Sequence, residues 1–138
     1  MGFVKPLILD DATKEEREFD PLTDLLVGAT EKDTTALQPI ISAGPAVIAH
    51  NLSGIPCAIF VFLKNKTAEF GYVPNDIVLI HAGPQRNNNS GVMIRPDATD
   101  LNIKFGSSAT VFNVVDATTG QAKGITNTFW DVFFVSFF

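Results

Sequence analysis

The residues of this 138-residue chain that could do nucleophilic chemistry are one cysteine and two histidines. His50 ends the apolar run AVIAH, His81 lies near the end of IVLIHA, and Cys57 opens CAIFVFL. A thiolate beside an imidazole can act as a nucleophile with its base. A thiol that opens an apolar strand is usually buried and inert, and no third group is placed to orient a base. We therefore expect these residues to be structural and the protein not to be an enzyme.

Metal and cofactor motifs are also missing from the sequence. The two histidines have neither the HxH nor the HxxxH spacing of common metal sites. The stretch PDATD (residues 96–100) has carboxylates but lacks the glycine and the terminal glutamate of a calcium loop, so we expect a turn capped by an aspartate. Neither GxGxxG nor GxxxxGK[ST] occurs. We expect no metal and no cofactor.

One polar stretch, QRNNNSG (residues 85–91), could present amides and a guanidinium to a sugar or to another protein. Its composition is equally typical of a solvated hairpin tip. If this stretch binds a ligand, the contact residues are Arg86, Asn87, Asn88 and Asn89.

Charge is distributed unevenly along the chain. Residues 1–45 hold nine acidic and four basic side chains, a net charge of −5, whereas residues 46–138 hold six of each and are neutral. Neither part has the basic footprint of a nucleic-acid-binding protein. We find no signal-peptide pattern at the start and no apolar run of the roughly 18 residues that a membrane helix needs. The near-neutral second part removes one barrier to self-association.

Short apolar runs punctuated by Gly, Pro, Asn and Asp dominate the chain from residue 46 onwards. This spacing predicts an all-β domain, a single sandwich or jelly roll of about eight short antiparallel strands. Residues 1–45 are predicted to form an extended acidic arm with at most one short helix, in DDATKEEREFD (residues 10–20). The expected strands are residues 46–50, 57–63, 68–73, 77–82, 92–95, 101–105, 110–115 and 129–138.

The closing run FWDVFFVSFF (residues 129–138) is apolar at positions that point to both faces of a strand. Such a strand needs cover on both sides. The sandwich core is one cover, and the other is either the arm of the same chain or another chain. The run CAIFVFL (residues 57–63) has the same two-sided character and is the predicted neighbour of the closing strand. The interface candidates are Leu7, Leu9, Leu25, Leu26, Phe129, Trp130, Phe133, Phe134, Phe137 and Phe138.

Several segments resemble accessory virion proteins of tailed bacteriophages. In AVIAHNLSGIPCAIFVFL (residues 46–63) the matching residues are His50, Asn51, Leu52, Gly54 and Pro56, with Cys57 where valine is usual. The similarity continues in TDLNIKFGSSATVFNVV (residues 99–115), in the closing run, and in the leader VKPLILDDATKEEREFDPLTDL (residues 4–25). On this view His50 and Asn51 satisfy backbone groups in the turn and are scaffold residues.

The resemblance implies a structural protein of the virion, assembled in the host cytoplasm. We expect a capsid decoration (cement) protein that stabilises the head by non-covalent contacts at capsomer junctions. Its partners would be the major capsid protein or another virion protein and further copies of itself, in a dimer or trimer, without nucleic acid or membrane. The alternative is a head- or tail-fibre module that recognises a host receptor or glycan through residues 85–91 and Tyr72.

Overall fold

The computed structural model describes residues 7–9, 16–18, 30–84 and 89–138 and divides into two compact units, Met1–Thr30 and Glu31–Phe138. In the first unit, β1 (Leu7–Leu9) pairs antiparallel with β2 (Glu16–Glu18). The short helix predicted for residues 10–20 is therefore wrong at residues 16–18, and the rest of that stretch lies outside the described residues. A helix of about nine residues is unstable by itself, and the run LIL offers those residues a strand partner instead.

The second unit, called the body here, is built almost entirely from strands. Among the body residues that the structure describes, the one other element is the 3₁₀ turn η1 (Asn127–Phe129). The strands are β3 (Lys32–Thr34), β4 (Gln38–Pro39), β5 (Pro45–Ala49), β6 (Ala58–Asn65), β7 (Ile77–Ile80), β8 (Gly83–Pro84), β9 (Gly91–Pro96), β10 (Asp100–Phe105), β11 (Asn113–Val115), β12 (Ala122–Gly124) and β13 (Trp130–Phe137).

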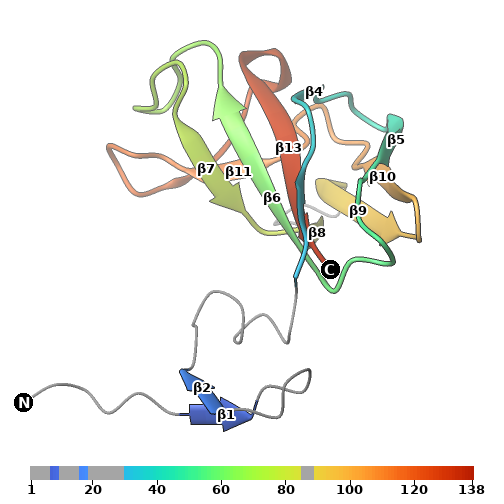
Figure 1. Ribbon diagram of the computed structural model, residues 1–138. Coiled ribbons are helices and arrows are strands. Elements are labelled where there is room, and N and C mark those ends of the chain that lie inside the picture. The colour runs from blue at the N-terminus through green and yellow to red at the C-terminus, as the bar shows by residue number, and fades with distance from the viewer. Residues whose placement is uncertain (1–6, 10–15, 19–29, 85–88) are drawn as a thin grey trace, which may run out of the picture. The chain divides into compact units, whose positions relative to one another are not determined.

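These strands form two main antiparallel sheets and one small hairpin. The five-stranded sheet has the order β3-β13-β6-β7, with β4 also paired to β13, and the four-stranded sheet has the order β5-β10-β9-β8. Strands β11 and β12 pair with each other. In Figure 1 the closing strand β13 (red) runs between β6 (green) and β4 (cyan). The all-β antiparallel fold predicted from the sequence is confirmed, while the jelly-roll order of the strands stays a prediction.

Alternation along the strands places one face of each main sheet in a shared core. Every second residue of β13, from Trp130 to Ser136, is buried, and so are alternate residues of β6 and β10. Because successive side chains of a strand point to opposite faces, the intervening residues lie on the outside. The core cluster comprises Ile40, Val61, Leu63, Val92, Leu101, Ile103, Phe105, Val111, Phe112, Val114, Ile125, Trp130, Val132 and Phe134.

Strands β8 and β12 lie outside the eight expected strands, and two further segments differ from the sequence prediction. Residues 68–73 hold only an isolated bridge between Glu69 and Tyr72, because Phe70 and Gly71 adopt positive φ angles of 52° and 84° and turn the chain. Residues 31–45, assigned to the arm from their composition, supply β3 and β4 to the body. Both strands hydrogen-bond to β13, so the closing strand has neighbours on each side.

Candidate functional site

The His50 side chain is used to hold a turn. Its ring Nε2 lies 2.8 Å from the carbonyl oxygen of Asp97, and its Nδ1 accepts a hydrogen bond from the backbone N–H of Leu52 at 3.3 Å. The ring is buried, and backbone groups are the partners of both its nitrogens. The expectation that His50 satisfies backbone groups in the turn is confirmed. The amide of Asn51 instead donates to the carboxylate of Asp33 at 3.4 Å.

The other residues considered for catalysis lie in different surroundings. Cys57 is exposed, in contrast to the buried thiol expected from an apolar strand, because it precedes β6 at the end of the sheet. His81 is also exposed and follows β7. Among the residues that the structure describes, no group of three or more His, Cys, Asp or Glu side chains comes close enough to hold a metal ion.

The PDATD stretch forms the tight turn between β9 and β10, as predicted. The carboxylate of Asp97 accepts hydrogen bonds from the backbone N–H groups of Thr99 at 2.9 Å and Asp100 at 2.7 Å, and from the amide of Asn102 at 3.0 Å. These donors hold the pKa of the Asp97 carboxyl well below its usual range. The carboxylate therefore serves the hairpin turn and is occupied by this chain's own donors.

Apolar side chains gather on the outer face of the five-stranded sheet, called the outer face here. Directly opposed residues of neighbouring antiparallel strands share a face. The register opposes Phe62 to Phe133 and to Leu79, and Val135 to Phe60. Phe60 and Leu79 keep 40% and 59% of their surface exposed, and Ile77 keeps 56%. The outer face comprises Phe60, Phe62, Ile77, Leu79, Phe133, Val135 and Phe137.

Aromatic contacts order the side chains at the centre of the outer face. The rings of Phe62 and Phe133 are stacked with centroids 5.2 Å apart and planes 14° apart. The ring of Phe60 meets that of Phe137 edge to face, with centroids 5.9 Å apart. Each such pair contributes about 0.5–1.5 kcal/mol beyond its area burial. The four rings therefore form an ordered aromatic platform across β6 and β13.

The core holds this platform in place from below. On the opposite side of β6 and β13, Val61, Leu63, Val132 and Phe134 are at most 1% exposed. Close packing of a core leaves such residues little freedom. The outer face is thus a firm surface on paired strands, well suited to recognition by shape.

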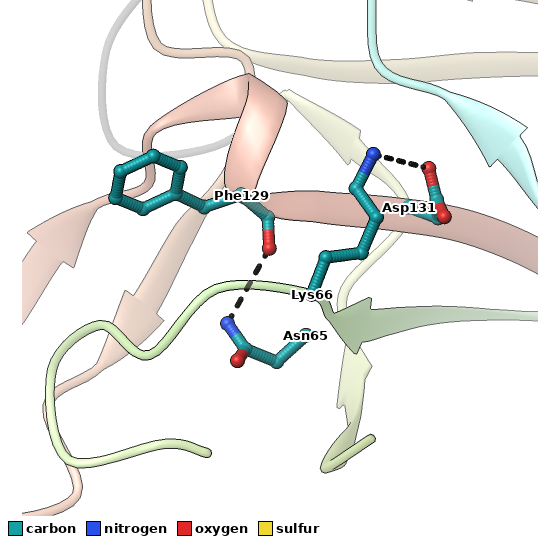
Figure 2. Close-up of polar contacts among 4 residues, drawn as sticks. All are labelled: Asn65, Lys66, Phe129 and Asp131. Atoms are coloured by element: carbon teal, nitrogen blue, oxygen red, sulfur yellow. Dashed lines mark hydrogen bonds and ion pairs between the residues drawn. The ribbon is translucent and has the colours of Figure 1, made fainter. Parts of the chain in front are cut away.

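An ion pair lies at one end of the outer face, shown in Figure 2. The ammonium of Lys66 lies 3.1 Å from the carboxylate of Asp131, and Asp131 is directly opposite Lys64 in the strand register. The amide of Asn65 donates to the carbonyl oxygen of Phe129 at 3.5 Å and to that of Thr67 at 2.8 Å. These bonds tie the end of β6 to η1 and so position the ion pair at the rim.

The predicted interface residues separate into different environments. Phe133 and Phe137 lie on the outer face, but Trp130 and Phe134 are fully buried in the core and cannot make an external contact. Phe129 is half-buried in η1, and the ring of Phe138 lies against Gly54, where a Cβ would come within 2.5 Å of it. Leu7 and Leu9 belong to β1, and Leu25 and Leu26 lie outside the described residues.

The receptor-loop candidates are mostly beyond what the structure describes. Arg86, Asn87 and Asn88 lie outside the described residues, and Asn89 is an exposed turn residue before β9. Tyr72, the other residue of that hypothesis, donates its hydroxyl to the carbonyl oxygen of Val115 at 2.6 Å and packs edge to face on Trp130. Its hydroxyl therefore already has a partner within the body.

Sequence reasoning identified β13 and missed much of the surface around it. The pairing of β6 with β13 confirms the predicted neighbour relation, but Phe60, Phe62, Ile77 and Leu79 were not proposed as interface residues. A signal was present in the uninterrupted runs AIFVFL and IVLI, which are apolar on both strand faces.

Comparisons of the chain with protein-family models, with curated proteins and with solved structures find no match. In the described part of the chain no helix is long and apolar enough to cross a membrane.

Proposed function

We propose that this protein is a structural component of a tailed-phage virion, a capsid decoration protein that stabilises the head by non-covalent contacts. The observation that carries the proposal is the outer face, an aromatic surface built on the two central strands of a sheet. The resemblance of residues 46–63, 99–115 and 129–138 to accessory virion proteins supplies the virion context.

The outer face favours a role in assembly because of how much apolar surface it leaves in water. Isolated exposed apolar residues are normal on any protein, but a contiguous apolar patch usually marks a contact site. Here the exposed side chains of Phe60, Ile77 and Leu79 adjoin the half-buried rings of Phe62 and Phe133. Burial of apolar area contributes about 25 cal/mol per Å², and a symmetric shell repeats that contribution in every copy.

Removal of the protein from virus particles tests this proposal. Particles of a phage that lacks the gene should release their DNA at a lower temperature than complete particles. Adding back the purified protein should restore the original temperature. A protein that is missing from complete particles, or heads whose thermal stability does not change without it, would refute the proposal.

The choice of variant for that experiment follows from the structure. Truncation of residues 134–138 would remove Phe134 and Ser136, which are fully buried, and would unfold the body. Leu79→Lys places a charge on the outer face at an exposed position and leaves the core intact. Val47→Lys is the matched control, because Val47 is 68% exposed and lies on β5 of the other sheet. Only Leu79→Lys should fail to restore the heads.

A further inference from the structure

We infer that the outer face binds the outer face of a second copy of this chain, so that the protein is a homo-oligomer before it meets any other partner. This inference rests on the proposed function in so far as both use the outer face. Two features of that face favour another copy as its occupant: its size and its uncharged centre.

The size of the outer face suits a sheet of the same kind. Strands β3, β4, β6, β7 and β13 have three, two, eight, four and eight residues. With a rise of ~3.4 Å per residue and strands ~4.8 Å apart, they cover about 400 Å² in projection. The accessible area of a face studded with side chains is larger than its projection. Two such faces therefore approach the ~1,000 Å² of total buried area at which specific interfaces begin. An identical five-stranded sheet matches the face over its whole extent, as in the aligned packing of two sheets about 10 Å apart.

The charge distribution of the outer face also favours self-association. Its centre carries the four rings described above and no ionisable group. At one end, Asp131 is neutralised by Lys66 at 3.1 Å, with Lys64 opposite in the register. At the other end, Lys32 is opposite Phe137 at the β3 edge. Because its centre is uncharged, the face can pack on a second copy of itself without bringing like charges together there.

Sedimentation of the full-length protein over a range of concentrations tests this inference. We expect a dimer for the unchanged chain, because a face that binds itself closes with two copies, and at least a tenfold weaker association for Leu79→Lys and for Phe60→Lys. Val47→Lys, on the outer side of the four-stranded sheet, should associate like the unchanged chain. Fluorescence of Trp130 and circular dichroism show whether each variant is folded. If Phe60→Lys fails to fold, Leu79→Lys still tests the inference, because Leu79 is the more exposed residue.

A monomeric unchanged chain, or an oligomer insensitive to both lysine substitutions, overturns the inference. Thiol labelling of Leu79→Cys in a Cys57→Ser background then identifies the alternative. Slow labelling of a monomer would mean that the leader of the same chain covers the outer face. Fast labelling would mean that the outer face is open to solvent and available to a different virion protein.

The two proposals fail in different ways. A monomer that still restores the thermal stability of heads refutes self-association and keeps the proposed function. If instead the protein forms an oligomer that Leu79→Lys disrupts, but the protein is missing from particles, self-association is kept and the proposed function is refuted.

Discussion

Removal of the Glu69 carboxylate is expected to destabilise the start of β13, and the only tryptophan of the chain reports it. Oε1 of Glu69 accepts a hydrogen bond from the indole Nε1 of Trp130 at 3.1 Å and another from the backbone N–H of Thr126 at 2.9 Å. Trp130 is fully buried, whereas Thr126 is exposed. Water can therefore replace the second bond but not the first.

The magnitude follows from these two bonds. A hydrogen bond to a charged group contributes about 1.5–3 kcal/mol, and a buried donor left without a partner costs about 1–3 kcal/mol. Both ranges describe the loss of the same hydrogen bond to the indole N–H, one as the bond that is lost and the other as the donor that is left unpaired. They are therefore not added. Glu69→Ala should lower the free energy of unfolding by about 2–4 kcal/mol, with the smaller part from Thr126. Glu69→Gln retains an acceptor oxygen and should lose about 1 kcal/mol.

Urea unfolding followed by fluorescence and by far-ultraviolet circular dichroism measures these differences. The control is a double-mutant cycle with Trp130→Phe, read by circular dichroism. In the Trp130→Phe background no indole N–H is left unpaired. The loss of unfolding free energy caused by Glu69→Ala should therefore be smaller there than in the unchanged protein, by at least about 1.5 kcal/mol. Equal costs in both backgrounds, or a loss below ~0.5 kcal/mol for Glu69→Ala alone, would refute the reasoning.

Three further predictions concern the body. Gly106→Ala should lower the melting temperature strongly, because a Cβ there would lie 2.2 Å from the backbone oxygen of Asn89, and an unchanged melting curve would contradict this packing. Phe134→Ala, in the core, should lower the free energy of unfolding by about 3–5 kcal/mol in urea titrations, and a loss below ~1 kcal/mol would contradict its burial. Asp97 has a pKa below its unfolded value, so its contribution is complete above about pH 4 and is lost as the pH falls through the lowered pKa. Urea midpoints measured between about pH 5 and pH 2 should therefore fall less steeply for Asp97→Ala than for the unchanged protein, and equal slopes would contradict the role of this carboxylate.

Local patterns were sufficient to predict the fold class and several details of the chain. Strict alternation in LNIKF predicted β10, with Leu101, Ile103 and Phe105 inward, and all three are buried. The composition of PDATD predicted the aspartate-capped turn, since that interaction needs only residues within three positions of Asp97. The two-sided run at residues 129–138 correctly marked β13 as a strand that is apolar on both faces.

The assignments that failed depend on partners that are distant in the sequence. Residues 31–45 have weak strand propensity, and β3 and β4 exist because β13 offers them its open edge about 100 positions later. The predicted strand at residues 68–73 is interrupted by a turn that contains Phe70. The carbonyl oxygen of Phe70 accepts a hydrogen bond from the backbone N–H of the distant Ala117 at 2.9 Å. Such pairings carry little local signal in the chain.

The sequence by itself determined that this is an all-β protein whose last strand carries more apolar surface than one core can cover. Only the tertiary structure decided which of those rings are hidden and which are presented. The register of β13 against β6 sends Trp130 and Phe134 into the core and leaves Phe133 and Phe137 on the outer face beside Phe62 and Phe60. The physical reason is that a strand has a period of two, so a shift of one residue would exchange the two sets. That register is selected by packing against a second sheet, which no local pattern contains.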